Sequence, residues 1–195
     1  MKFDYPIGAT PIDEDEASEL IPTHITFVVE LNEFEAQNIL KAEKKYFANK
    51  FKFEEILSYS FLLKVHKDMF DETWKWVGKI RKTMKNIGVE VSQIAEQTIN
   101  LCNDTRYWIE NKTYSYDEIG TRFHHRLVQI HLFPNGNGRH ARFITDLLML
   151  NLGNKVFSWG SKDLFHNGKS RIEYISALRE ADKNIYEQLL KFVRS

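Results

Sequence analysis

The sequence predicts an all-α protein, an orthogonal bundle of helices with one small β-hairpin. Three observations favour this class. Apolar residues recur at helical spacing in several separate stretches. A serine or asparagine stands three residues before a glutamate at several of their starts, as in a capping box. Residues 143–150 are apolar on nearly all sides, as a central helix requires. At 195 residues the chain has room for one domain with a sizeable core.

The N-terminal part predicts an irregular arm followed by two helices. Residues 1–24 hold three of the four prolines and an acidic cluster at 13–16, which favours irregular structure. Asn32 and Glu35 form a capping pair that predicts a helix to about Phe47. The next helix carries an apolar stripe at four-residue spacing, namely Leu57, Phe61, Val65 and Met69. We therefore divide the chain into an arm, 1–32, and a helical domain, 33–195.

The remaining elements follow from the same signals. Residues 78–90 alternate Ile80, Thr83, Ile87 and Val89 with turn formers, which predicts the short hairpin. A long helix is expected at about 91–111, and Ser115 with Glu118 predicts the start of a helix that ends at His131. The apolar helix at 143–150 comes next. Two C-terminal helices are expected, one from Ser170 and one carrying the apolar residues Ile185, Leu189 and Phe192.

Composition limits the classes of function. The chain has 27 basic and 27 acidic residues and a net charge of zero, which argues against a surface that coats nucleic acid or a membrane. Cys102 is the only cysteine, so no internal disulfide can form. No signal peptide and no run long enough to span a bilayer is visible. We expect a cytoplasmic protein.

Residues 130–142, IHLFPNGNGRHAR, combine features that suit a polyphosphate. Pro134 disfavours the α conformation at the residue before it, so the preceding helix should stop there. Gly136 and Gly138 allow positive φ and can point consecutive N–H groups inward. The following helix begins under this turn, and Arg139 and Arg142 lie on its first turn. One histidine, His131, stands beside the turn as a candidate general base.

The motif resembles the signature of the Fic family, in which a histidine and a phenylalanine precede Gly-Asn-Gly-Arg and a second arginine follows. The lead-in FHHRLVQI at 123–130 and WVGKIR at 76–81 also resemble Fic proteins, the latter at the start of the Fic flap. The resemblance covers about 74–150. It implies the Fic fold and a protein adenylyltransferase, which moves AMP from ATP to a hydroxyl of another protein.

This resemblance assigns roles within the motif. It implies that His131 is the base, that Gly136, Asn137, Gly138 and Arg139 bind the α- and β-phosphates, and that Arg142 holds the γ-phosphate. The plainer interpretations are a structural histidine and a solvated helix start. Two arginines beside a positive helix end make better sense with an anion between them. A zinc site of His124, His125 and His131 is rejected because the spacing is poor and no carboxylate or thiolate is near. Gly138 argues against the phosphate-transferring Doc type, which has lysine there.

Asn135 departs from the family pattern, because active Fic enzymes carry Asp or Glu there to hold Mg²⁺. An amide oxygen can bind a hard cation, but more weakly than a carboxylate. We therefore expect ATP as substrate with Mg²⁺, and Asn135 as a weak metal ligand. The alternative is a non-catalytic or weakly active Fic-fold module that binds a nucleotide or a partner.

The predicted hairpin resembles the flap that holds the target segment as an added strand. The flap residues expected to bind the target are Lys79, Ile80, Arg81, Lys82 and Thr83, and an ordinary surface hairpin is the alternative. The partner is then a protein that presents a Ser, Thr or Tyr hydroxyl.

Autoinhibition is a further expectation. Thr26 to Glu30 approximates the family's inhibitory pattern, which makes Glu30 the candidate inhibitory carboxylate and Arg142 its expected partner. Glu180, preceded by Ser176, is the rival match, and a plain surface glutamate is the other interpretation. The chain also resembles a bacterial Fic subgroup encoded beside a helix-turn-helix protein. This resemblance suggests a toxin–antitoxin-like setting with an antitoxin-like regulator.

Overall fold

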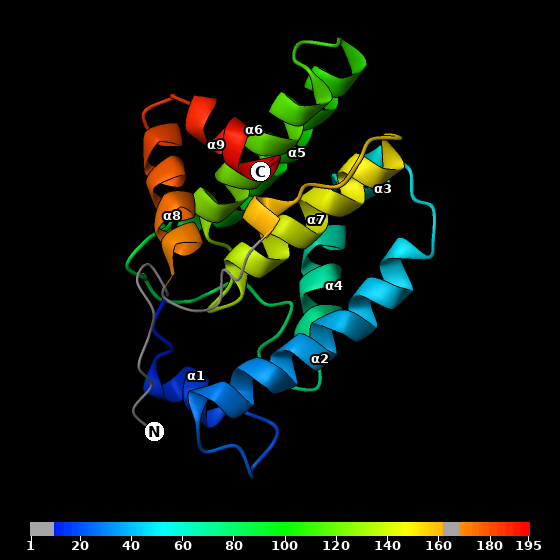
Figure 1. Ribbon diagram of the computed structural model, residues 1–195. Coiled ribbons are helices and arrows are strands. Elements are labelled where there is room, and N and C mark those ends of the chain that lie inside the picture. Colours follow the sequence, from blue (N-terminus) through cyan, green and yellow to red (C-terminus); the bar gives the residue numbers. More distant parts are fainter. Residues whose placement is uncertain (1–9, 162–167) are drawn as a thin grey trace.

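The computed structural model describes residues 10–161 and 168–195, and in these ranges it is built of helices (Figure 1). The α-helices are α1 (Glu14–Ser18), α2 (Val28–Phe47), α3 (Phe53–Ile56), α4 (Tyr59–Phe70), α5 (Ile94–Glu110), α6 (Tyr116–Ile130), α7 (Asn137–Asn151), α8 (Lys169–Ala181) and α9 (Glu187–Val193). Short 3₁₀ turns stand at Val91–Gln93 and Trp159–Ser161. The first nine residues of the predicted arm lie outside the described residues.

Helix α7 is the centre of the domain, as its sequence predicts. It packs against α2, α3, α4 and α6, while α8 and α9 pack together at the far edge of α6 (Figure 1). Ile144, Leu147 and Leu148 of α7 are fully buried, as are Phe123 and Ile130 of α6. Full burial of a Leu or Phe side chain stabilises a fold by about 1.5–3 kcal/mol. The two helices that flank the motif are therefore fixed by the core, and the motif is the loop between them.

The predicted start of a helix is accurate where the predicted residue caps the helix with its side chain. Ser115 is the N-cap of α6, and its hydroxyl accepts a hydrogen bond from the Glu118 amide. The start of α2 was predicted too late, at Asn32. The helix begins at Val28, because the Glu30 carboxylate accepts the backbone N–H groups of Thr26 and Phe27 at 3.0 and 3.1 Å. Glu30 therefore lies inside the first long helix and not on a separate arm.

The predicted hairpin is wrong. Residues 79–90 form an irregular loop, and within the described part of the chain the β pairing is limited to an isolated bridge between Leu20 and Trp74. The reason lies in the hydrogen bonds. The backbone N–H groups of Arg81 and Val89 donate to carbonyls at the end of α6 and just after it. The Arg81 guanidinium donates to two carbonyls of the loop itself. The two sides of the loop therefore form hydrogen bonds with the end of α6 and with Arg81, and they do not pair with each other as strands.

No helix in the described ranges is both long enough and apolar enough to cross a membrane. The longest, α2, has 20 residues and is rich in charge.

Candidate active site

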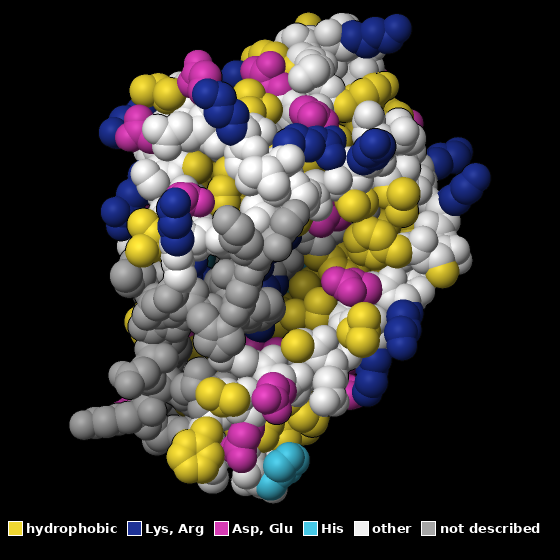
Figure 2. Space-filling model, in the orientation of Figure 1, with side chains coloured by type: hydrophobic (Ala, Val, Ile, Leu, Met, Phe, Trp, Pro, Cys, Tyr) yellow, Lys and Arg dark blue, Asp and Glu magenta, His cyan; other side chains and the backbone are white. Residues whose placement is uncertain are grey.

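The motif lines a cleft of about 800 Å³. Its walls come from the N-terminal arm, α2, the loop at 86–89, α6, the start of α7 and α8. On the face shown in Figure 2, dark blue Lys and Arg side chains lie deep in a hollow bordered by yellow hydrophobic surface. Binding sites for small molecules in proteins have volumes of about 300–1,000 Å³, so the cleft is large enough for a nucleotide.

Buried polar side chains fix the motif loop in one conformation. The Asn137 side chain accepts the Phe133 amide at 2.8 Å and donates to the Phe133 carbonyl at 2.7 Å. His66 of α4 stacks on Phe133, with ring centroids 3.6 Å apart. Its Nδ1 accepts the Gly78 amide, so its Nε2 carries a proton and donates to the Asn135 carbonyl at 3.1 Å. Asn137, predicted to bind phosphate, therefore uses its side chain to hold the loop.

The two glycines of the motif have different roles. Gly136 has φ of +79°, and a Cβ there would lie 2.7 Å from the Phe70 ring, so only glycine fits. Gly138 lies in the first turn of α7, and a Cβ there would meet only Arg142, at 3.8 Å. The first-turn N–H groups of a helix have no partner within the helix. They open here onto the cleft, which places a positive helix end where an anion would bind.

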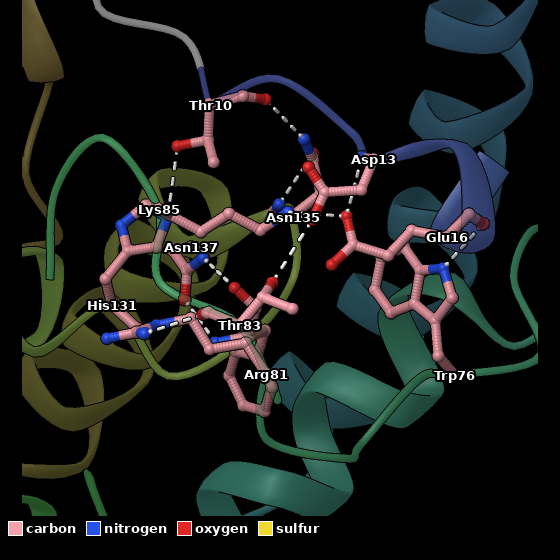
Figure 3. Close-up of polar contacts among 12 residues, drawn as sticks. Thr10, Asp13, Glu16, Trp76, Arg81, Thr83, Lys85, His131, Asn135 and Asn137 are labelled. Carbon is pink, nitrogen blue, oxygen red and sulfur yellow. Dashed lines mark hydrogen bonds and ion pairs between the residues drawn. The ribbon is translucent and has the colours of Figure 1, made fainter. Parts of the chain in front are cut away.

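His131 is the C-cap of α6 in the left-handed conformation, with φ of +57°. Its ring lies in the cleft, 4% exposed, and its Nε2 is 3.0 Å from the hydroxyl of Thr10 (Figure 3). A helix C-terminus favours the charged imidazolium. Burial and the nearby Arg81 charge outweigh that effect and lower the pKa of His131 to about 4. The imidazole is neutral at physiological pH, as a general base must be.

Arg81 is a fully buried cation behind the motif. Its Nε donates to the His131 carbonyl at 2.7 Å, and its other nitrogens donate to the carbonyls of Thr83 and Val89. Gly88 makes room for it, because a Cβ there would lie 2.5 Å from the guanidinium. Arg81 was predicted to bind the target. It instead positions His131 and the loop, because its guanidinium faces inward.

The other predicted flap residues remain available at the surface. Lys79, Lys82 and Thr83 are exposed, and Ile80 is half-buried. The Thr83 hydroxyl donates to the Asp13 carboxylate of the arm at 3.1 Å.

Arg139 lies in the cleft and is paired with a carboxylate that the motif does not contain. Its Nη1 is 2.5 Å from Glu35 of α2, and its Nη2 donates to the Asn135 side chain at 3.1 Å. Glu35 also accepts the Trp74 indole N–H at 2.8 Å and is buried. An anion that binds Arg139 therefore competes with Glu35, or shares the guanidinium with it.

Arg142 lines the cleft one helical turn further along. Its guanidinium lies over the Tyr174 ring, 5.8 Å from the centroid. Among the described residues it makes no ion pair with Glu30. The Glu30 carboxylate is fully exposed and caps its own helix. Glu180 pairs with Lys183 on the surface of α8 and does not line the cleft. The expected contact between Glu30 and Arg142 is therefore absent, and Glu35 is the glutamate that reaches the site.

Asn135 makes three contacts that decide what it can bind. Its Oδ1 accepts the Gly136 amide at 2.7 Å and the Arg139 guanidinium at 3.1 Å, and its Nδ2 donates to the Thr10 carbonyl at 3.1 Å. The oxygen predicted to hold Mg²⁺ already accepts two donors, one of them a cation. The described residues also contain no cluster of three or more His, Cys, Asp or Glu that could bind a metal. The protein groups here do not fit a resident metal ion.

Sequence reasoning missed four residues that shape this site: Thr10, Glu35, His66 and Lys85. Two of them, Glu35 and His66, carry a signal in the sequence. Both are polar residues on otherwise apolar helix faces, a position that usually requires a buried partner. Thr10 and Lys85 lie in irregular segments and carry no such periodicity. The side chain of Lys85 is 3% exposed and pairs with Asp13 at 2.8 Å and with Glu16 at 2.7 Å.

Over the described residues, fold and site define a helical protein whose cleft combines two arginines and a helix N-terminus with a buried histidine. Residues 56–149 match the model of the Fic/DOC family. A protein of Aquifex aeolicus (strain VF5), named as a probable protein adenylyltransferase, is 26% identical over 152 residues. That match covers 76% of this chain and 43% of the relative, so the chain spans less than half of that protein.

Solved structures share the fold. The BepC protein of Bartonella tribocorum, with bound AMPPNP, has a TM-score of 0.66 and 18% identity, over 93% of this chain and 96% of that one. The N-terminal Fic domain of a VirB-translocated Bep effector protein from Bartonella quintana, with bound ADP, has a TM-score of 0.68 and 18% identity, over 88% and 86%. The matched segment, residues 56–149, is a Fic domain, and the helical fold of the chain is shared with these structures.

Proposed function

We propose that this chain is a protein adenylyltransferase that moves AMP from ATP to a Ser, Thr or Tyr hydroxyl of a target protein. One observation carries the proposal. A neutral histidine, His131, points its Nε2 into the cleft that also contains the open helix end and Arg139, and this nitrogen already contacts a hydroxyl. A base beside an anion site is the arrangement that attack of a hydroxyl on a phosphate needs.

The comparisons support a nucleotide as the ligand. The relative from Aquifex aeolicus is named for adenylyl transfer, and the two Bartonella structures bind AMPPNP and ADP. In this chain the first-turn amides of α7 and Arg139 would hold the α- and β-phosphates, and Arg142 would hold the γ-phosphate. A charge-assisted hydrogen bond of this kind contributes about 1.5–3 kcal/mol. Mg²⁺ would then enter with the phosphates of ATP, since Asn135 offers it little.

The proposed reaction uses groups in the cleft and one arginine behind it. His131 takes the proton of the target hydroxyl, whose oxygen bonds to the α-phosphorus as pyrophosphate leaves. Arg81, through the His131 carbonyl, fixes the position of the base. The positive end of α7 and Arg139 stabilise the charge that develops on the phosphates. The target would lie along the exposed Lys79, Lys82 and Thr83, and an antitoxin-like regulator is a further proposed partner.

The position of the label in ATP tests this function. We expect the purified chain to attach radioactivity from α-labelled ATP, but not from γ-labelled ATP, to protein in a lysate of the source cell. AMP transfer keeps the α-phosphate on the target, whereas phosphate transfer keeps the γ-phosphate. Labelling from γ-labelled ATP alone would replace adenylyl transfer by a kinase-type reaction. No labelling from either form would favour the second candidate, a module that binds a nucleotide or a partner without catalysis.

The observation that favours this second candidate is Asn135, where active Fic enzymes carry an acid. We expect Asn135→Asp to raise the transfer rate and to make it depend more steeply on Mg²⁺, because a carboxylate binds the metal more tightly and the metal offsets phosphate charge. A Mg²⁺ titration of transfer by both proteins measures this. The isosteric change preserves both acceptor contacts of Oδ1 and removes the hydrogen bond that Nδ2 donates to the Thr10 carbonyl. An unchanged Mg²⁺ dependence would mean that the site works with the amide.

A further inference from the structure

The N-terminal arm places a hydroxyl on the candidate base. The Thr10 Oγ1 lies 3.0 Å from His131 Nε2, and Thr10 is 8% exposed (Figure 3). A general base must lie within about 2.6–3.2 Å of the oxygen whose proton it takes. When the neutral imidazole carries its proton on Nδ1, its Nε2 accepts from the Thr10 hydroxyl, and the two groups form the donor–acceptor pair that precedes proton transfer.

The main chain of Thr10 is fixed as well. The Asn135 side chain donates to the Thr10 carbonyl at 3.1 Å, while its oxygen accepts from the Gly136 amide and Arg139. An aspartate at this position would have no hydrogen to donate to that carbonyl at neutral pH. Asparagine, the departure from the family pattern, therefore connects the arm to the phosphate-binding turn.

The segment after Thr10 holds the arm against the loop that was expected to bind targets. Asp13 and Glu16 both pair with Lys85, whose side chain is almost fully buried. Asp13 also accepts the Thr83 hydroxyl, and the Glu16 carbonyl accepts the Trp76 indole N–H at 3.2 Å. A hydroxyl residue with carboxylates three and six positions later is thus seated between His131 and the loop, as an acceptor segment would be.

We propose that Thr10 is an intramolecular acceptor, so that the chain attaches AMP from ATP to its own Thr10. This inference rests on the proposed function. The Thr10 oxygen bonds to the α-phosphorus of ATP, the bond from that phosphorus to the pyrophosphate oxygen breaks, and the hydroxyl proton passes to His131 Nε2. The product is an AMP ester of Thr10 together with free pyrophosphate. An unmodified arm also competes with any external hydroxyl for the base.

Mass spectrometry of the purified full chain after incubation with ATP and Mg²⁺ tests the inference. We expect one AMP group on the wild-type chain, mapped to Thr10, with a first-order rate that does not change on dilution of the protein. Thr10→Ser keeps the hydroxyl and should still be modified, whereas Thr10→Val has no hydroxyl and should not be modified. Thr113→Val, at an exposed threonine outside the cleft, is the matched control and should behave as wild type.

Four results would overturn the inference. AMP mapped to other residues, with Thr10 unmodified, would show that the seated hydroxyl is not an acceptor. So would equal self-labelling of Thr10→Val and wild type. Label on lysate proteins that increases in Thr10→Val, with none on the wild-type chain itself, would make the arm a cover only, and the proposed function would stand. If neither lysate nor chain is labelled by any variant, the proposed function fails and the inference fails with it.

Discussion

Replacing His131 by alanine is expected to lower AMP transfer by about 10²–10⁴-fold, because a positioned base contributes roughly that factor. ATP affinity should change little, since the contacts proposed for the phosphates come from α7 and its arginines. Transfer assays with α-labelled ATP and calorimetric titration with ATP measure the two effects separately. His24→Ala, at an exposed histidine outside the cleft, is the matched control.

The same experiment separates chemistry from folding. His131 is buried, so the variant must first show an unchanged circular dichroism spectrum and a cooperative melt. If a folded His131→Ala variant transfers AMP at the wild-type rate, His131 is a structural residue and the base lies elsewhere. In the wild type, the pKa of His131 is about 4, so titration of this base should not change the transfer rate between pH 8 and 6. The rate should fall only in more acidic solution, where the imidazole becomes protonated.

Acidification from pH 7.5 to 5 is expected to destabilise the protein strongly, because several of its histidines are buried in the neutral form. Burial lowers the pKa of His131 and of His140 to about 4 each. In the unfolded chain a histidine titrates near 6.5, so the unfolded state binds more protons between these values. This stability is therefore complete above about pH 6.5 and is lost as the pH falls. At pH 5 each such histidine lowers the free energy of unfolding by about 2 kcal/mol relative to neutral pH.

A variant isolates this effect from the titration of other groups. Within the described ranges, His140 hydrogen-bonds to an uncharged group, because its Nε2 donates to the Leu62 carbonyl at 3.0 Å. Glutamine at 140 can donate to that carbonyl and does not titrate. Urea unfolding of His140→Gln and wild type at both pH values measures the difference. The loss of unfolding free energy between pH 7.5 and 5 should be about 2 kcal/mol smaller in the variant. Equal losses would exclude a neutral buried His140 as a source of acid sensitivity.

The parts of this protein that the sequence predicts are those encoded by neighbouring residues. Periodicity places α5, α6 and α7, and the Ser115 cap marks the start of α6. Of the two motif glycines at which the sequence allows positive φ, Gly136 has it, whereas Gly138 is helical. The failures come where a side chain far along the chain takes over. The loop at 79–90 has the composition of a hairpin, but the buried Arg81 guanidinium satisfies its carbonyls, so the limbs need not pair.

Contacts across long stretches of sequence account for the rest of the site. Thr10 and His131 are 121 residues apart, and Glu35 and Arg139 are 104 apart. Nothing local to either pair fixes such a contact, because it depends on how α2 and the arm pack on α7. Glu30 illustrates the point. Its carboxylate is satisfied by the amides of its own helix start and has no need of a distant arginine.

The two stacked tryptophans before the loop give this protein a native optical probe. The rings of Trp74 and Trp76 lie 5.2 Å apart. The Trp74 indole donates to Glu35, which pairs with Arg139, and the Trp76 indole donates to the Glu16 carbonyl of the arm. Indole fluorescence responds to hydrogen bonding and to nearby charge. One ring therefore bonds to a carboxylate that faces the arginine side of the cleft, and the other bonds to the arm. A change at either contact should alter the emission of this pair, which variants of Trp108 and Trp159 separate from the emission of the other two tryptophans.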